Sequence, residues 1–78
     1  MSHRLSNVSL QVLRKYLQQC GCEYQRAKGG HEKWVKDGFT RPIVLQSHID
    51  PVPERIVKQC LSLLGVSRKE FERALEEL

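Results

Sequence analysis

The spacing of apolar residues changes twice along the chain, and this change constrains the fold more than any other feature of the sequence. Apolar side chains in residues 5–20 recur at the period of an amphipathic helix. Between residues 22 and 46 they alternate in short segments interrupted by glycines, as in β-strands, and helical spacing returns after Pro53. The sequence therefore predicts an α+β fold in the order α-β-β-β-α-α.

The first helix is expected to begin after Ser6 or Ser9, either of which can cap it, and to end at Cys20, with Gly21 following. Its apolar face is predicted to hold Leu5, Val12, Leu13, Tyr16 and Cys20, with Leu10 and Leu17 along the edge. Such a helix lies against a core on one side only.

The two later helices carry clear start and stop signals. Pro53 suits the first turn of one helix, and Gly65 ends it. Ser67 opens the last helix, where Glu70 completes a capping box. The apolar stripe of the longer helix is predicted to contain Ile56, Val57, Cys60, Leu61 and Leu64.

Three strands are expected over residues 22–27, 32–36 and about 39–46, joined by tight turns at residues 28–31 and at Asp37-Gly38. Pro42 indicates an edge position for the third strand, because proline cannot donate a hydrogen bond to a neighbouring strand. Strands joined by short turns form an antiparallel meander. The two longer helices can cover one face of this sheet, which leaves the other face open to solvent.

A chain of 78 residues is predicted to form one domain, residues 1–78, because it is too short to enclose two cores. It is also too short for a large internal cavity, so any active site is expected to be a shallow surface feature. No apolar run is long enough to span a membrane and no leader opens the chain, which favours a cytoplasmic protein. The three cysteines, Cys20, Cys22 and Cys60, are interpreted as reduced core thiols.

Positive charge is concentrated in the first half of the chain. Residues 1–41 hold eight basic and three acidic side chains, a net +5, whereas residues 42–78 have a net charge of −1. A positive surface of this kind attracts a polyanion such as RNA, because each neutralised phosphate releases counterions. An ordinary basic surface with no such partner is the alternative.

Several catalytic arrangements lack support in the sequence. No cofactor motif, phosphate-binding loop or dinucleotide fingerprint is present, and no cysteine, histidine or acidic cluster has the spacing of metal ligands. Two-carboxylate hydrolysis is poorly supported, because Glu23 and Glu32 are separated by a turn and Asp37 lies in another.

His31 beside cations is the strongest candidate for chemistry. It follows Gly29 and Gly30, whose small size lets a phosphate approach the backbone. The nearby cations are Arg26, Lys28 and Lys33. A histidine can remove the proton of an RNA 2′-hydroxyl, and cations can stabilise the charge that develops on the phosphate. The alternative is a surface histidine next to a hairpin turn.

A resemblance to a known family adds to this reading. The segment from Leu13 to His31 is similar to the opening of HicA-type mRNA interferase toxins, which have a helix ending in glycine and a strand leading to a Gly-Ser-His motif. The similarity continues to His48, where the family often has a second histidine. It extends over nearly the whole chain, through Trp34-Val35, Ile43-Val44-Leu45, Leu61, Gly65-Val66-Ser67 and Phe71.

The resemblance implies a fold like that of double-stranded-RNA-binding domains, cleavage of mRNA, and neutralisation by a HicB-type antitoxin. It carries the family's essential histidine to His31 and its loop glycine to Gly29. Two positions depart from the family pattern. Gly30 replaces the usual serine, which removes a hydroxyl from the turn, and Cys22 replaces an aromatic residue, which thins the core.

Three other side chains have two possible interpretations each. His48 is either a second acid-base group or a loop histidine bonded to backbone. Trp34 and Tyr24 either stack on RNA bases or fill the core, and the core is the expectation for Trp34 because few other large residues are present. The leading hypothesis is a metal-independent RNA endonuclease. The alternatives are a non-catalytic RNA-binding module of the same fold and a protein-interaction domain.

Overall fold

The computed structural model describes residues 5–26 and 28–78. A short 3₁₀ helix, η1 (Leu5–Asn7), precedes the main elements. These are α1 (Leu10–Gln19), β1 (Glu23–Arg26), β2 (His31–Val35), β3 (Ile43–Gln46), α2 (Glu54–Leu64) and α3 (Arg68–Leu75). The predicted α+β fold and its order α-β-β-β-α-α are confirmed, with η1 as an addition.

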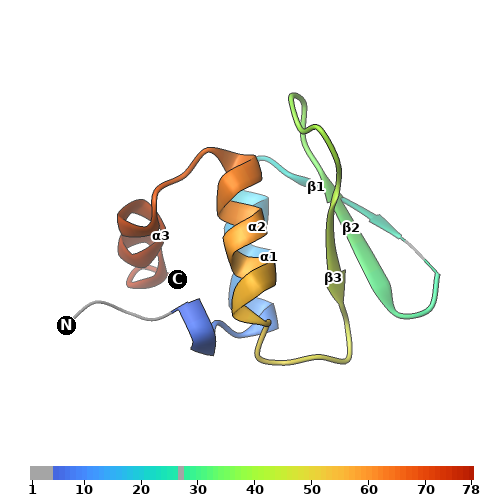
Figure 1. The fold of residues 1–78 in the computed structure, drawn as a ribbon, viewed down its shortest axis with the longest axis horizontal. Coiled ribbons are helices and arrows are strands. Elements are labelled where there is room, and N and C mark those ends of the chain that lie inside the picture. The colour runs from blue at the N-terminus through green and yellow to red at the C-terminus, as the bar shows by residue number, and fades with distance from the viewer. Residues whose placement is uncertain (1–4, 27) are drawn as a thin grey trace.

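The elements form three layers, which Figure 1 shows from the side. The sheet is one layer, α1 and α2 cover one of its faces, and α3 lies on the far side of these helices. Alternate residues of β2 and β3 are buried, as expected for strands covered on one face only. The opposite face of the sheet is open, as predicted.

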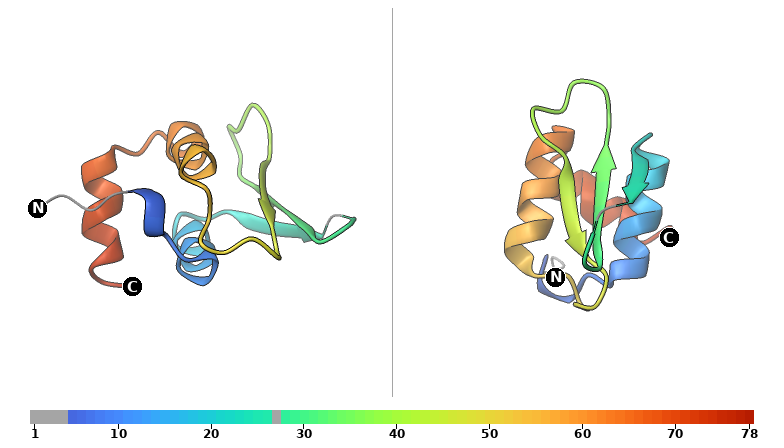
Figure 2. Two further views of the ribbon diagram at one scale, coloured as in Figure 1. Left: turned by 60° about the horizontal axis from the view of Figure 1, so that its bottom comes forward. Right: turned by 90° about the vertical axis from the view of Figure 1, so that its right-hand side faces the viewer.

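The sheet has the order β1-β2-β3, so β1 and β3 are its edges. Both pairs of neighbouring strands are antiparallel. Residues opposite one another in such a pair point to the same face. Trp34, which pairs with Tyr24 and Ile43, lies on the face toward the helices, and His31 lies on the open face opposite Gln46. Figure 2 shows the two edges and the helices behind them.

The core lies between the sheet, the helix pair and α3. Trp34 is 2% exposed, which confirms its predicted place in the core. Phe71 of α3 is fully buried, and its ring packs edge-on against Tyr16 with 4.9 Å between the ring centroids. The other buried apolar residues are Leu5, Val8, Leu10, Leu13, Leu17, Cys22, Ile43, Leu45, Val52, Val57, Cys60 and Leu61.

The cysteines are free thiols, as predicted. Cys22 and Cys60 are buried and Cys20 is half-buried. Burial raises the pKa of the Cys60 thiol to about 12 and also raises the pKa of Cys22. These two thiols therefore stay protonated near neutral pH and pack as small apolar groups.

Most of the predicted helix ends agree with the structure. Ser9, rather than Ser6, caps α1: its hydroxyl accepts a hydrogen bond from the Val12 N–H over 3.1 Å. Ser67 and Glu70 form the predicted capping box of α3, and Gly65 ends α2 with a left-handed φ of 69°. Pro53 is the N-cap residue of α2, one position before the predicted first turn.

The buried face of α1 differs slightly from the prediction. Leu10 and Leu17, expected at the edge of the apolar face, are buried, whereas Val12, expected within it, is only half-buried. The two leucines face the core because α3 and the sheet both pack against this helix and widen the side on which it is covered.

The predicted start of the third strand is wrong. β3 begins at Ile43 rather than near Phe39, and residues 36–42 form a long connection instead of a two-residue hairpin. A turn does form at Asp37-Gly38, where the Phe39 N–H donates to the Lys36 carbonyl over 3.1 Å. The half-buried Phe39 ring packs against the core, and Pro42 has no N–H for the ladder, so pairing starts after it.

The pattern expected for the first strand is confirmed at Cys22, which is buried just before β1, but is wrong at Tyr24; Ala27, the last residue of the predicted strand, lies outside the described residues. All four residues of β1 are exposed. Tyr24 points to the same side of the sheet as Trp34 but is 53% exposed. Edge strands are covered only where another layer reaches them, and a hollow separates β1 from α1 at this point.

Within residues 5–26 and 28–78, none of the helices combines the length and the apolar character that a membrane span requires.

Candidate functional site

The turn that precedes β2 has a backbone that favours glycine. Gly29 and Gly30 have φ angles of 70° and 77°, in the left-handed region that residues with a Cβ rarely adopt. The N–H of His31 donates to the Lys28 carbonyl over 3.4 Å, which closes the turn. The Ser47 N–H donates to the Gly30 carbonyl over 2.7 Å and so ties the turn to the end of β3. His31 is therefore held at the start of a strand by bonds on both sides.

An open hollow of about 510 Å³ lies around this turn. Five of the predicted site residues line it, and all five are exposed. Its lining consists of Tyr24, Arg26, Lys28, Gly29, Gly30, His31 and Ser47. The structure therefore brings together the histidine, two cations and the glycines that the sequence singles out. Lys33 does not line the hollow; it lies farther along β2, on the open face with His31.

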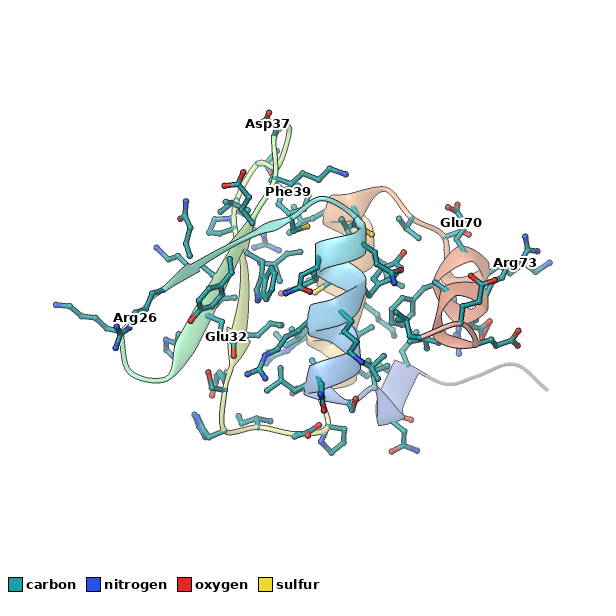
Figure 3. The ribbon with its side chains drawn as sticks, turned by 180° about the vertical axis from the view of Figure 1, so that it is seen from behind. Arg26, Glu32, Asp37, Phe39, Glu70 and Arg73 are labelled. Carbon is teal, nitrogen blue, oxygen red and sulfur yellow. The ribbon has the colours of Figure 1, made fainter. Side chains whose placement is uncertain are left out.

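The hollow is at the end of the sheet and reaches side chains from both faces. Arg26 pairs with Glu32, the neighbour of His31, so Arg26 and His31 project to opposite sides of the sheet. Figure 3 shows Arg26 extending from the end of the sheet, far from α3. An elongated ligand that crosses this end can meet Arg26 on one side and His31 on the other.

His48 lies beside the same turn. Its Nδ1 atom is 3.7 Å from the position that a Cβ would occupy at Gly30, and the residue is exposed. Both histidines of the predicted site thus flank Gly30, although 17 positions separate them in the sequence. A second residue with acid-base capacity is available at this end of the sheet.

Directly after His31, the chain buries a carboxylate. Glu32 is 5% exposed and reaches from β2 to Arg14 of α1; it is labelled beside the strands in Figure 3. Its oxygens accept hydrogen bonds from the Arg14 guanidinium, from the Trp34 indole N–H over 3.2 Å and from the Ser47 hydroxyl over 2.9 Å. A buried charge is tolerated when it is paired and hydrogen bonded in this way.

The hydrogen bonds from Arg14 hold the pKa of Glu32 below its usual value; those from Ser47 and Trp34 act in the same direction, while burial opposes them. The same contact raises the pKa of Arg14. Glu32 is therefore ionised near neutral pH and serves as an anchor. Since Ser47 bonds both to Glu32 and to the turn, this anchor fixes the position of the turn that carries His31.

Sequence reasoning missed Ser47 and the role of Glu32. Glu32 is in phase with Trp34 on alternating strand positions, which already indicates that it faces the core. A carboxylate in such a position requires a cation, and Arg14 occupies the helix between the buried Leu13 and Leu17. Ser47 gives no comparable signal, because its contacts depend on how β3 ends.

Tyr24 lies where two hollows meet. A second hollow of about 360 Å³, between α1 and β1, is lined by Arg14, Gln18, Tyr24, Glu32 and Trp34. The rings of Tyr24 and Trp34 are tilted against each other with centroids 5.4 Å apart, so the tyrosine ring is supported from the core. Its exposed part is available for a planar group to stack on, whereas the burial of Trp34 excludes that residue from such a role.

In the described part of the chain, no three histidine, cysteine, aspartate or glutamate side chains are grouped as ligands for a metal ion. Comparisons with protein-family models, curated proteins and solved structures find no match to this chain. Function is therefore inferred from the residues of the site itself. Two cations, two histidines and an exposed aromatic ring around a glycine turn can bind a phosphate backbone, accept a stacked base and transfer protons.

Proposed function

We propose that this protein is an RNA endonuclease that works without a metal ion, with His31 as its acid-base residue. One observation carries the proposal: His31, Arg26 and Lys28 line a single open hollow, with His48 beside the same glycine turn. The hollow is shallow and exposed, which suits a large polyanion that docks from outside.

The reaction follows from the 2′-hydroxyl of RNA. His31 takes the proton of this hydroxyl, and the oxygen attacks the adjacent phosphorus. The bond from phosphorus to the 5′-oxygen breaks, and that oxygen takes a proton from an acid, for which His48 is the candidate. The products are a 2′,3′-cyclic phosphate and a 5′-hydroxyl end. Lys28 stabilises the negative charge on the phosphate as the new bond forms, while Arg26, on the other side of the sheet, binds the RNA farther along its backbone.

The biological setting proposed for this activity comes from the family resemblance. As a HicA-type mRNA interferase, the protein would be the cytoplasmic toxin of a toxin-antitoxin pair, and a HicB-type antitoxin would silence it. The basic hollow supports this setting in one respect, because an acidic surface of a partner is attracted to it and can cover it directly.

A non-catalytic RNA-binding module is the second candidate. The observation in its favour is Gly30, which presents no side chain to the hollow at the position where the family has a serine. The cations and Tyr24 would bind RNA whether or not a bond is broken. The two candidates differ only in whether His31 transfers a proton.

Incubation of the purified protein with a synthetic single-stranded RNA in the presence of EDTA separates the candidates. Because imidazole and cations supply every role in the proposed reaction, cleavage should proceed with EDTA present and leave cyclic phosphate ends. Binding that weakens with salt but gives no cleavage identifies the module instead. Inhibition by EDTA that magnesium reverses, or no binding to RNA at all, contradicts the proposal.

A further inference from the structure

The outer edge of β3 presents unpaired backbone groups. In an antiparallel pair, hydrogen-bonded residue pairs alternate with pairs that are not hydrogen bonded. The bond from the Ser47 N–H to the Gly30 carbonyl places Gly30 and Ser47 in the first class, so Val44, three residues before Ser47, falls in the second. The N–H and C=O of Val44 therefore point away from β2, toward the free edge of the sheet.

A groove runs along this edge, between β3 and α2. Two pockets, of about 120 Å³ and about 360 Å³, share Val44, Gln46 and Ile56 and so form two ends of one depression. Ile49 lies in one end and Leu63 in the other, and both are half-buried. Figure 2, in its right-hand view, shows β3 and α2 side by side over the length of the strand.

The groove is apolar in its floor and positive at both ends. Arg41 lines one pocket and Arg55 the other, while no aspartate or glutamate lines either. Glu54, next to Arg55 in the chain, is outside both pockets. An occupant that fits must offer a backbone donor and acceptor to Val44, apolar side chains to the floor and negative charge at its ends.

We propose that this groove docks an extended, acidic peptide segment of a partner protein, which adds a fourth strand beside β3. Peptide backbone satisfies both groups of Val44, and alternate side chains of an added strand can reach Ile56 and its neighbours. RNA fits less well, because its charged phosphates would lie on the apolar floor between the two arginines. A second copy of this chain would bring Arg41 against Arg55 or another Arg41, which is repulsive. This surface is separate from the hollow that contains His31.

Selection of random dodecapeptides displayed on phage, with the whole protein as target, tests the proposal. The expected peptides have apolar residues at every second position and carry Asp or Glu near both ends. Bound as synthetic peptides, they should protect the Val44 amide from hydrogen exchange. Val44→Pro removes the outward N–H at an edge position where proline is tolerated, and should weaken binding by about tenfold.

Charge reversal provides a second measure that does not depend on how the proline variant folds. Arg41→Glu with Arg55→Glu should weaken peptide binding by about tenfold or more, whereas the matched reversal of Lys15 and Lys69, both exposed on other helices, should not. Equal binding to wild-type protein and to the Arg41 and Arg55 variant overturns the proposal. So does a selection that recovers no such peptide, dimerisation through this edge, or protection of the Val44 amide by RNA instead.

Discussion

At the residue scale, the site depends on one side chain that does not line the hollow around His31. Glu32 connects Arg14 of α1, Trp34 of β2 and Ser47 after β3, and Ser47 in turn bonds to the turn before His31. The histidine, the glycines and the cations are visible in the sequence because they are adjacent in it. The role of Glu32 is not visible in the same way, since Arg14 and Ser47 lie 18 and 15 positions from it in the sequence. They meet Glu32 only through the register of the strands.

The depressed pKa of Glu32 predicts how stability responds to acid. A carboxyl whose pKa is lower in the folded state binds fewer protons there than in the unfolded chain, so stability rises with pH across that interval. The contribution is complete above the unfolded value of about 4.3 and is lost as pH falls through the lower folded pKa. Urea unfolding from about pH 6 to about pH 3 measures this dependence.

Glu32→Gln should flatten this pH dependence and lower stability at neutral pH, because the variant leaves Arg14 without its charged partner. Glu23→Gln is the matched control, since Glu23 is an exposed strand carboxylate. If both variants keep the wild-type slope against pH, the buried ion pair does not control acid stability.

At the element scale, the connection between β1 and β2 was easier to predict than the connection between β2 and β3. Its turn contains two glycines with positive φ, and the neighbouring strands follow directly. The connection between β2 and β3 misled sequence reasoning, because Asp37-Gly38 does form a turn but Phe39 and Pro42 delay pairing until Ile43. Local turn signals fix where a chain reverses, whereas packing against the core fixes where pairing begins.

The structure of this hairpin predicts that Lys28 and Lys33, which the sequence analysis groups together as cations near His31, contribute differently to RNA binding. Lys28 lines the hollow and Lys33 does not, so only Lys28 is placed to contact a phosphate there. Lys28→Ala should reduce the slope of log K against log salt for single-stranded RNA by about 0.7, the loss of one phosphate contact. Lys33→Ala and Lys69→Ala should change it less. Filter binding over a range of salt concentrations measures the slopes; equal effects of Lys28 and Lys33 would move the RNA onto the open face of the sheet.

At the scale of the whole molecule, the layered arrangement leaves the end of the sheet uncovered. α3 packs behind the helix pair, far from the hollow, so no element of the described chain is placed as a lid over His31. This order of elements follows from the hydrophobic spacing, which is why the fold class was predictable. The position of the hollow at this end of the sheet could not be predicted, since it depends on how far each strand extends beyond the helices.

If the protein is a toxin as proposed, a partner protein has to cover this open site from outside. A HicB-type antitoxin is expected to cover the hollow, abolish cleavage and protect the His31 imidazole from diethylpyrocarbonate. Because the hollow is basic, association should slow as salt rises. Stopped-flow mixing of the two proteins at several salt concentrations measures this rate. A complex that leaves His31 reactive and cleavage intact contradicts the proposed silencing.

We propose that His31 transfers the proton in RNA cleavage, and the single-turnover cleavage rate of the His31→Ala variant measures this role on its own. The residue is exposed at the start of β2, so the variant should fold and unfold like the wild-type protein. With EDTA present, its cleavage rate should fall at least about 100-fold, the usual scale for a positioned acid-base group, while RNA binding persists. A folded His31→Ala protein that cleaves RNA at the wild-type rate would contradict the account.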